Sequence, residues 1–261
     1  MHSWCRRITL SLILILSGVV LLGSCTDDNT PTPSAEPPDC PTTLDENTLE
    51  RLTLSLTTLS PTIEMQPGEV YTFTLGVVEC CYVFEAVPAC AAWSIEPATG
   101  AHIDPHSGLF SVDAETPSGS VFTVRADVEQ GRRVVSIDVH VFTPQANPLA
   151  RLWREEAQLT CADGEEVAPA SPIGELRFRA DGTFGVTWHP FEMYVDYWGT
   201  YTYSLEGALE LTITGGNYVP DDVDGIGSFS FDAQGYLVLE DMWLGSPMEG
   251  VEDVNCGHRF Y

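Results

Sequence analysis

Aromatic and acidic side chains gather in one part of the C-terminal half, and they are the residues best suited to hold a ligand. Seven aromatic residues recur in a short stretch: Trp188, Phe191, Tyr194, Tyr197, Trp198, Tyr201 and Tyr203. Aromatic rings beside carboxylates suit a neutral or cationic ligand, or a sugar stacked on a ring. We predict a ligand-binding site composed of Tyr194, Tyr197, Trp198, Asp221, Asp222 and Asp224. The alternative is that the rings pack the interior and the acids keep the protein soluble.

Two groups of side chains have the composition of a metal site, and a structural role is favoured for both. Asp221-Asp222-Val223-Asp224-Gly225 has carboxylates at a spacing that can wrap Ca²⁺. Pro220 stands where a full loop of that kind carries Asp, which favours a solvated turn. His102, Asp104 and His106 could meet in a loop, but Pro105 breaks any helical spacing of the two His. We predict no metal and no cofactor.

Residues for catalysis are few. The sequence has no nucleophile elbow, no phosphate-binding loop and no H-E-x-x-H motif. His189 and His258 share the C-terminal half with carboxylates such as Glu192 and Asp196, and a His near a carboxylate can act as a general base. Because any acidic chain offers such neighbours, we predict a non-catalytic protein. An enzyme that uses His189 with Glu192 or Asp196 is the alternative.

The charge balance excludes several classes of partner. The 261 residues contain 38 acidic and 11 basic side chains, a formal charge of −27, and every basic residue is Arg. Nothing in the chain could neutralise a row of phosphates, so we predict no nucleic-acid partner. The same shortage of cations argues against electrostatic binding to anionic lipid.

The first residues resemble the export signal of a bacterial lipoprotein. Arg6-Arg7 precede an apolar run from Ile8 to Leu22, which is shorter than the roughly 20 residues that span a bilayer as a helix. Leu22-Gly23-Ser24-Cys25 resembles a lipobox. The resemblance implies removal of residues 1–24, acylation of Cys25 with a palmitate-type chain, and anchoring in a membrane. Thr26 after the lipidated Cys favours the outer membrane; an ordinary secretory signal is the alternative.

The remaining cysteines indicate an oxidising compartment. Six stay in the mature chain: Cys40, Cys80, Cys81, Cys90, Cys161 and Cys256. An even number in an exported protein predicts three disulfides. Cys161 and Cys256 are alone in the C-terminal half, so we expect them to pair. The other four allow three connectivities, of which we favour Cys90 with one of the vicinal pair and Cys40 with the other.

The elements that carry these residues are strands. Residues 25–43 hold the lipidated Cys and a Pro-rich tether that reaches on the order of 50 Å. Residues 44–143 show short strands between turns, which predicts a β-sandwich. The turn from Gly100 to Phe110 and the segment from Pro117 to Ala126 resemble bacterial Ig-like domains of the BIG-2 and cadherin-like kind. The resemblance implies a spacer or adhesive module.

Residues 149–261 form longer strands that meet in tight hairpins around Asp181-Gly182, Gly207 and Gly235. Eight such strands predict an antiparallel barrel with room for one ligand. Leu149-Ala150-Arg151-Leu152-Trp153 and Glu175–Phe184 resemble motifs of lipocalin-like lipoprotein domains, although Arg151 replaces a Gly. That resemblance implies that Arg259 stacks on Trp153.

The fold class we expect is all-β, with an Ig-like β-sandwich followed by a lipocalin-like barrel. The function we expect is a membrane-anchored envelope lipoprotein, on the periplasmic or exterior side, that binds a small apolar or glycan ligand or an envelope protein. A purely structural or adhesive protein with a solid barrel is the first alternative.

Overall fold

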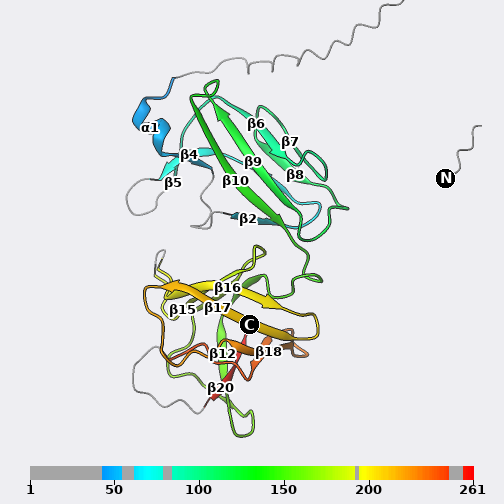
Figure 1. Cartoon of the computed structure of the whole chain (residues 1–261), viewed down its shortest axis with the longest axis vertical. Coiled ribbons are helices and arrows are strands. Elements are labelled where there is room, and N and C mark those ends of the chain that lie inside the picture. The colour runs from blue at the N-terminus through cyan, green and yellow to red at the C-terminus, as the bar shows by residue number, and fades with distance from the viewer. Residues whose placement is uncertain (1–42, 55–61, 79–83, 192–193, 247–254) are drawn as a thin grey trace, which may run out of the picture. The chain divides into compact units, whose positions relative to one another are not determined.

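The computed structural model describes residues 43–261 apart from 55–61, 79–83, 192–193 and 247–254. The predicted signal, the lipidation site Cys25, the tether and Cys40, Cys80, Cys81 and Glu192 lie outside the described residues. No helix in the described part of the chain is long and apolar enough to cross a bilayer. The regular secondary structure of the described residues is almost entirely strand, with one short helix, which confirms the prediction of an all-β protein (Figure 1).

The strands form two groups with separate hydrophobic cores, which we call the N-terminal β-region (residues 43–143) and the C-terminal β-region (residues 149–261). The N-terminal β-region contains α1 (Glu46–Arg51), β1 (Leu52–Leu54), β2 (Thr62–Met65), β3 (Val70–Thr72), β4 (Leu75–Val78), β5 (Phe84–Ala86), β6 (Ala91–Glu96), β7 (Ala101–Ile103), β8 (Leu109–Val112), β9 (Val121–Val128) and β10 (Arg133–Val141).

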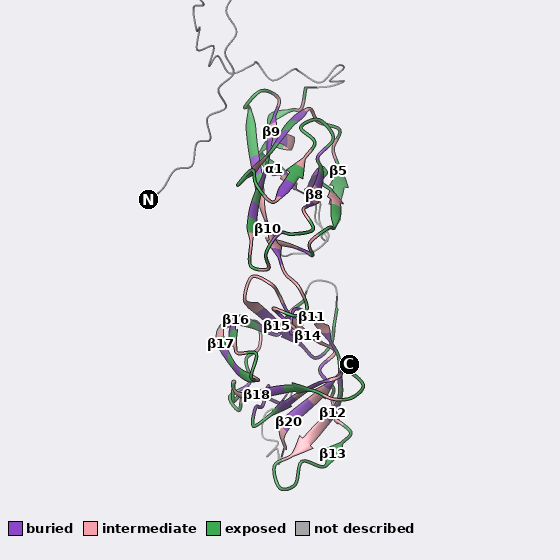
Figure 2. Cartoon of the chain, turned by 90° about the vertical axis from the view of Figure 1, so that its right-hand side faces the viewer, coloured by how far each residue is buried: buried purple, intermediate pink, exposed green. Residues whose placement is uncertain are grey.

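Three sheets surround the core of the N-terminal β-region. Their strand orders are β2-β10-β9-β6, β1-β4-β5 and β3-β8-β7, and β2 runs parallel to β10. Only Phe73 and Thr74 separate β3 from β4, so one stretch of chain joins two of the sheets. Phe73, Phe110 and Phe122 are buried at the centre, where Phe110 contacts both other rings edge-on. Exposed and buried positions alternate along β9, so one face of this strand packs on the core (Figure 2).

The sequence does not indicate every element of this region, and helix α1 and strand β2 are two that it misses. Helix α1 begins at Asp45, whose side chain accepts a hydrogen bond from the Thr48 backbone N–H at 3.0 Å and satisfies a free donor of the first turn. Strand β2 is only four residues long and pairs with the last strand of the region, more than seventy positions away. A local pattern of so few residues does not indicate a strand.

The C-terminal β-region contains β11 (Arg151–Trp153), β12 (Glu155–Thr160), β13 (Glu166–Val167), β14 (Glu175–Phe178), β15 (Thr183–Thr187), β16 (Tyr197–Tyr203), β17 (Ala208–Gly216), β18 (Ile226–Phe231), β19 (Leu237–Glu240) and β20 (Asn255–Phe260). They form one sheet in the order β11-β14-β15-β16-β17-β18-β19-β20-β12-β13. Only Arg154 separates β11 from β12, yet they pair with opposite ends of this order. The sheet therefore curls round, so that the continuous stretch from β11 to β12 pairs with β14 at one end of the sheet and with β20 near the other end.

The predicted hairpins of this region are observed. Gly182, Gly207 and Gly235 stand in three of the turns with φ of 81°, 105° and 82°, a conformation that is accessible to Gly and strained for other residues. The inner face of the sheet is filled by one cluster of side chains that includes Trp153, Phe178, Phe184, Tyr197 and Phe260. All five are fully buried.

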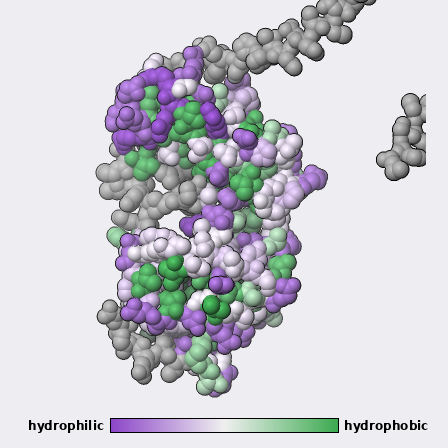
Figure 3. All heavy atoms as spheres, viewed as in Figure 1, coloured by the Kyte–Doolittle hydropathy of each residue, from purple (hydrophilic) through white to green (hydrophobic). Residues whose placement is uncertain are grey.

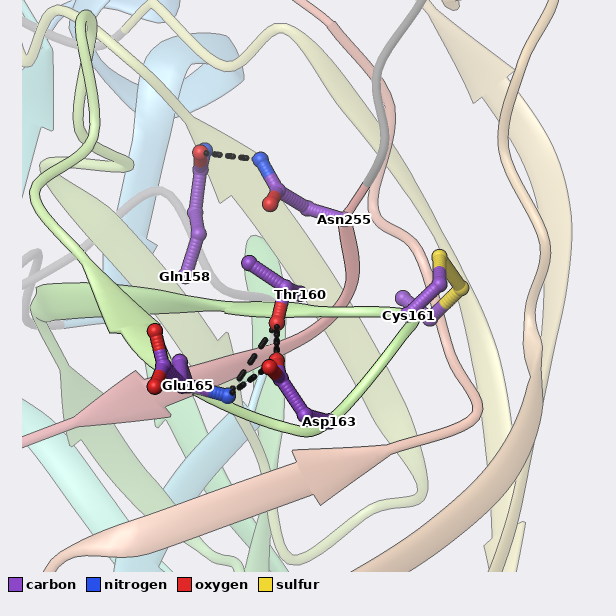
Figure 4. Close-up of a disulfide and its surroundings, with 7 residues drawn as sticks. Gln158, Thr160, Cys161, Asp163, Glu165 and Asn255 are labelled. Carbon is purple, nitrogen blue, oxygen red and sulfur yellow. Dashed lines mark hydrogen bonds between the residues drawn. A yellow bond between two sulfur atoms is a disulfide. The ribbon is translucent and has the colours of Figure 1, made fainter.

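A disulfide between Cys161 and Cys256 joins the start and the end of this region, as the sequence predicts, with Cα atoms 4.9 Å apart (Figure 4). Cys161 follows β12 directly and Cys256 lies in β20, and these two strands are paired. In the turn that follows Cys161, the Thr160 hydroxyl donates to Asp163 at 2.6 Å. That bond, together with one from the Glu165 backbone, lowers the pKa of Asp163 below its ordinary value.

Cys90 is also disulfide-bonded. The candidates for its partner, Cys40, Cys80 and Cys81, lie outside the described residues, so the predicted connectivities of the N-terminal β-region stay open.

Candidate binding face

Trp198 presents an aromatic ring on the outer face of the curled sheet. It is the second residue of β16, where buried and exposed residues alternate, and it is 42 % exposed. The residues directly opposite it are Gly185 on β15 and Gly215 on β17, so neither neighbouring strand has a side chain at that level. An indole flanked by two glycines has no cross-strand side chain to cover it.

The indole rests on the backbone of Gly215. A Cβ atom added to Gly215 would lie 3.1 Å from three atoms of the indole, Cε2, Cζ2 and Nε1. The Gly215 backbone therefore lies against the Nε1–Cε2–Cζ2 side of the indole. That side is supported by the strand, and the exposed area of the indole is on the remaining surface.

Tyr194 lies in the connection just before β16 and is 39 % exposed. Partial loss of hydration and a hydrogen bond to Asp196 raise the pKa of its hydroxyl above the ordinary value. Asp196 also accepts a hydrogen bond from the Trp188 backbone N–H at 2.8 Å, which fixes this connection against β15.

The connection before β16 and the connection after β17 lie at the same end of the sheet. The Asn217 backbone N–H donates to the Asp196 carbonyl at 2.7 Å, and the Asn217 side chain donates to the Val195 carbonyl at 2.8 Å. The segment before β16 and the segment after β17 are therefore bonded directly to each other.

Tyr197, in contrast, belongs to the interior. It is fully buried, and its hydroxyl donates to the Leu244 carbonyl at 2.7 Å. Burial, together with the nearby carboxylates of Asp196 and Asp222, raises its pKa well above the ordinary value. Its ring is not available to a ligand at the surface, so the structure removes Tyr197 from the exposed part of the predicted site.

The three acidic residues of the predicted site lie in the connection between β17 and β18, and Asp222 has a structural role there. Its carboxylate accepts hydrogen bonds from the Ser246 backbone at 3.0 Å, the Ser246 hydroxyl at 2.6 Å and the Trp243 indole at 3.1 Å. Burial alone would raise the pKa of Asp222, but these hydrogen bonds outweigh it and lower the pKa. Asp222 thereby ties this connection to residues 243–246.

Asp221 and Asp224 are both exposed. Asp224 forms an isolated bridge with Trp243, with backbone hydrogen bonds of 2.8 and 2.9 Å. Within the described residues, no group of three or more His, Cys, Asp or Glu side chains is arranged to hold a metal ion. Neither Asp221-Asp222-Val223-Asp224-Gly225 nor the His102 turn forms such a group.

Asp104 stabilises the turn that contains His102 and His106. Its carboxylate accepts hydrogen bonds from the Ser107 backbone at 2.7 Å, the Ser107 hydroxyl at 2.9 Å and the His106 backbone at 3.0 Å. These bonds lower the pKa of Asp104. His102 points to Asp113, 3.3 Å away, rather than forming a cluster with His106.

In the described part of the C-terminal β-region, the histidine with a carboxylate partner is His258, not His189. His189 is exposed, whereas His258 is fully buried on β20 with its Nδ1 atom 2.6 Å from Glu155 Oε1 on β12. Its Nε2 atom accepts a hydrogen bond from the Leu244 backbone N–H at 3.1 Å. Because both ring nitrogens are occupied and the ring stacks on Trp243 at 4.6 Å, this pair holds the fold together and offers no free base.

Two arginines stack on aromatic rings in this region, and the pairing differs from the expectation. Arg259 lies over Tyr236 at 4.4 Å, and Arg151 lies over Trp153 at 3.4 Å. The residue that departs from the lipocalin-like motif is therefore the one that covers the buried Trp. Loss of hydration lowers the pKa of Arg151 below its ordinary value. Arg259 is held away from Trp153 by Asp232, 2.7 Å from its guanidinium.

Comparisons with known proteins give little further information. No protein-family model matches the chain, and no curated protein matches it. Among solved structures, one similar chain is a structural-genomics protein of unknown function from Bacteroides ovatus, with 10% sequence identity over 80% of this chain and 92% of that chain. The TM-score is 0.28, and a likeness at that level carries no argument about fold or function.

Proposed function

We propose that this chain is a lipid-anchored envelope protein whose C-terminal β-region is a non-catalytic binding module. The anchor is Cys25 after removal of residues 1–24, and the Pro-rich tether of residues 25–43 lifts the folded part from the membrane. Support for the anchor comes from the order of the basic, apolar and lipobox segments. The oxidising compartment that it implies agrees with the Cys161–Cys256 disulfide.

We assign the N-terminal β-region as an Ig-like spacer. In an Ig-like sandwich one sheet contains strands A, B, E and D and the other contains C, F and G. The observed pairings fit that order if β1 is A, β4 and β3 together are B, β8 is E and β7 is D. The second sheet then follows as β6, β9 and β10 for C, F and G.

We assign the C-terminal β-region as a lipocalin-like barrel. If β11 and β12 are counted as one bent strand, they and β14 to β20 make eight antiparallel strands in sequence order. The stacking of Arg151 on Trp153 at 3.4 Å supports the assignment, because it places a cation where the resemblance expects one.

The proposed binding function rests on Trp198, whose indole is supported on one side by Gly215 and has no side chain opposite it on either neighbouring strand. The inner face of the sheet is filled by buried side chains, which favours a binding site outside the barrel over one within it. That filled interior also favours the rival function, a structural or adhesive protein with a solid barrel. The two functions differ in whether Trp198 has a partner.

The test measures binding of the full chain to isolated envelope fractions in a Cys25→Ser background, which removes the acyl anchor, and compares the parent protein with its Trp198→Ala and Leu205→Ala variants. Leu205 is 67 % exposed in the hairpin at the other end of β16, so it controls for loss of an exposed apolar side chain. We expect Trp198→Ala to lower binding at least about tenfold, as for a central aromatic contact, and Leu205→Ala to leave it unchanged. Equal binding by all three proteins would favour the structural rival.

A separate test addresses the anchor. We expect Cys25→Ser to move the protein from membrane to soluble fractions, because the acyl chains supply the attachment of a strongly acidic protein. Retention of the variant in the membrane pellet after a salt wash would contradict the lipoprotein assignment.

A further inference from the structure

A row of threonines lies beside Trp198 on the same outer face. Thr183 on β15, Thr200 on β16 and Thr212 on β17 are direct partners in the sheet. Thr200 is two residues from Trp198 on the same strand, so both side chains point outward, and Thr200 and Thr212 are exposed. In Figure 3 pale residues of intermediate hydropathy lie over β16 and β17.

The dimensions of this face follow from sheet geometry. Neighbouring strands are about 4.8 Å apart, so the row of three threonines is roughly 10 Å wide. Two residues along a strand cover about 6.8 Å, which is the distance from the row to the level of Trp198. The result is a surface with an aromatic ring on one side and hydroxyl groups on the other, with a register shift between β16 and β17 separating the two levels.

We infer that this face binds a neutral glycan, with one pyranose ring stacked on Trp198 and the next one hydrogen-bonded along the threonine row. This inference rests on the proposed binding function and names its ligand class. The C–H face of a pyranose carries partial positive charge and suits the negative face of an indole. Its hydroxyls are both donors and acceptors, and so are those of Thr200 and Thr212.

The charges around Trp198 and on the whole chain argue against an anionic glycan and against a second copy of this chain as the ligand. The outward positions on the described strands β15 to β17 around Trp198 carry no Arg. Two carboxylates lie near the row: Glu210 is opposite Thr202 at the next level, and Asp181 accepts a hydrogen bond from the Thr183 hydroxyl at 2.6 Å. An anionic glycan would therefore find no cation, and a second copy of a chain with a charge of −27 would be repelled. A stable protein interface needs about 800 Å² per partner with an apolar centre, whereas this face offers a single aromatic ring among hydroxyls.

The test is electrophoresis of the full chain in mild detergent through native gels that contain a dissolved polysaccharide. The neutral probes are yeast mannan, laminarin and dextran, and the anionic probe is polygalacturonate. We expect at least one neutral probe to retard the wild-type protein and polygalacturonate to have no effect. The strong negative charge of the protein drives rapid migration in such gels, so retardation is easily measured.

Three variants connect the retardation to this face. Trp198→Ala should weaken binding at least about tenfold. The Thr200→Val/Thr212→Val pair keeps the shape and removes two hydroxyls, so it should weaken binding several-fold. Gly215→Ala keeps the indole but places a methyl group 3.1 Å from three of its atoms, which lifts the ring and should also weaken binding. Leu205→Ala is the matched control, and thermal unfolding of each variant checks that it is folded.

The glycan inference is overturned if no neutral probe retards the wild type, if Trp198→Ala is retarded as strongly, or if polygalacturonate binds through Trp198. Periodate oxidation of the envelope fraction separates this failure from failure of the proposed function, because periodate cleaves the diols of glycans. Trp198-dependent binding that survives periodate would keep the binding module and remove the glycan. Loss of Trp198-dependent binding after periodate would support both the binding module and its glycan ligand.

Discussion

Removal of the Cys161–Cys256 disulfide is the perturbation whose size follows most directly from the structure. The bond connects positions 95 residues apart, and it joins the paired strands β12 and β20 at the two ends of the C-terminal β-region. A cross-link over a loop of that length reduces the entropy of the unfolded chain. The native pairing of β12 with β20 brings the two Cα atoms within 4.9 Å, so the folded state accepts the bond without rearrangement.

For a loop of this size the chain-entropy relation predicts a stabilisation of about 4–5 kcal/mol. That amount is comparable with the total stability of many domains, which is about 5–15 kcal/mol. We therefore expect the Cys161→Ala/Cys256→Ala double variant to lose most of the stability of the C-terminal β-region. The measurement is equilibrium unfolding in urea under non-reducing conditions, so that the disulfide of Cys90 stays intact in both proteins.

Tryptophan fluorescence reports on this region because Trp153, Trp188 and Trp243 are all buried there. An unchanged slope of free energy against urea, with a lower midpoint, would show that the variant loses stability and not compactness. A loss below about 1 kcal/mol would refute the reasoning, because it would mean that the unfolded chain is already restricted without the cross-link.

Three more predictions concern charge and polar contacts. His258→Ala should cost about 3–5 kcal/mol in unfolding free energy, because it leaves the Glu155 carboxylate buried without its partner; a smaller loss than for an exposed control such as His189→Ala would contradict the role of the pair. The lowered pKa of Asp222 means that its stabilisation is present above the unfolded pKa and is lost as pH falls through the lower folded value. The difference in melting temperature between wild type and Asp222→Asn should therefore be largest near pH 7 and shrink below about pH 4, and a difference independent of pH would refute it. Molar NaCl screens repulsion among the 38 acidic residues over about 3 Å, so the melting temperature should rise with salt and not stay constant.

The hairpins of the C-terminal β-region were predictable because their turns are set locally. A Gly at 182, 207 or 235 sits between two alternating segments, and a positive φ at that position is what a tight turn requires. The Cys161–Cys256 bond was predictable by elimination, because no other cysteine is present in that half of the sequence. Neither inference needed contacts between distant segments.

The polar side-chain contacts of the C-terminal β-region that sequence reasoning missed join residues far apart in the sequence. Glu155 and His258 are 103 residues apart, and nothing around either residue indicates the other. The same holds for Asp222 and Ser246, which are 24 residues apart and lie on either side of the hairpin of β18 and β19.

Arg151 shows the limit of motif comparison. As a replacement for Gly in the lipocalin-like motif it counted against the resemblance, and Arg259 was expected to cover Trp153. In the structure Arg151 covers Trp153, while Asp232 and Glu166 lie near the Arg259 guanidinium. A motif records which residue types recur at a position, but a guanidinium can reach the same ring from another position of the sheet.

The alternation of side chains along β16 decides which of the predicted aromatic residues can meet a ligand. Tyr197 and Tyr201 point to the core, whereas Trp198 is on the opposite face with Thr200 and Thr202. A protein that bound its ligand inside the barrel would need space among the inward rings, yet those rings contact one another: Tyr197 lies 6.1 Å from Phe184 and 6.0 Å from Trp188. The outward face has the opposite character, because neither Gly185 nor Gly215 places a side chain opposite Trp198, which stays 42 % exposed. The same period of two that fills the interior leaves Trp198 on the outer surface of β16, and this is why we place the proposed binding site there.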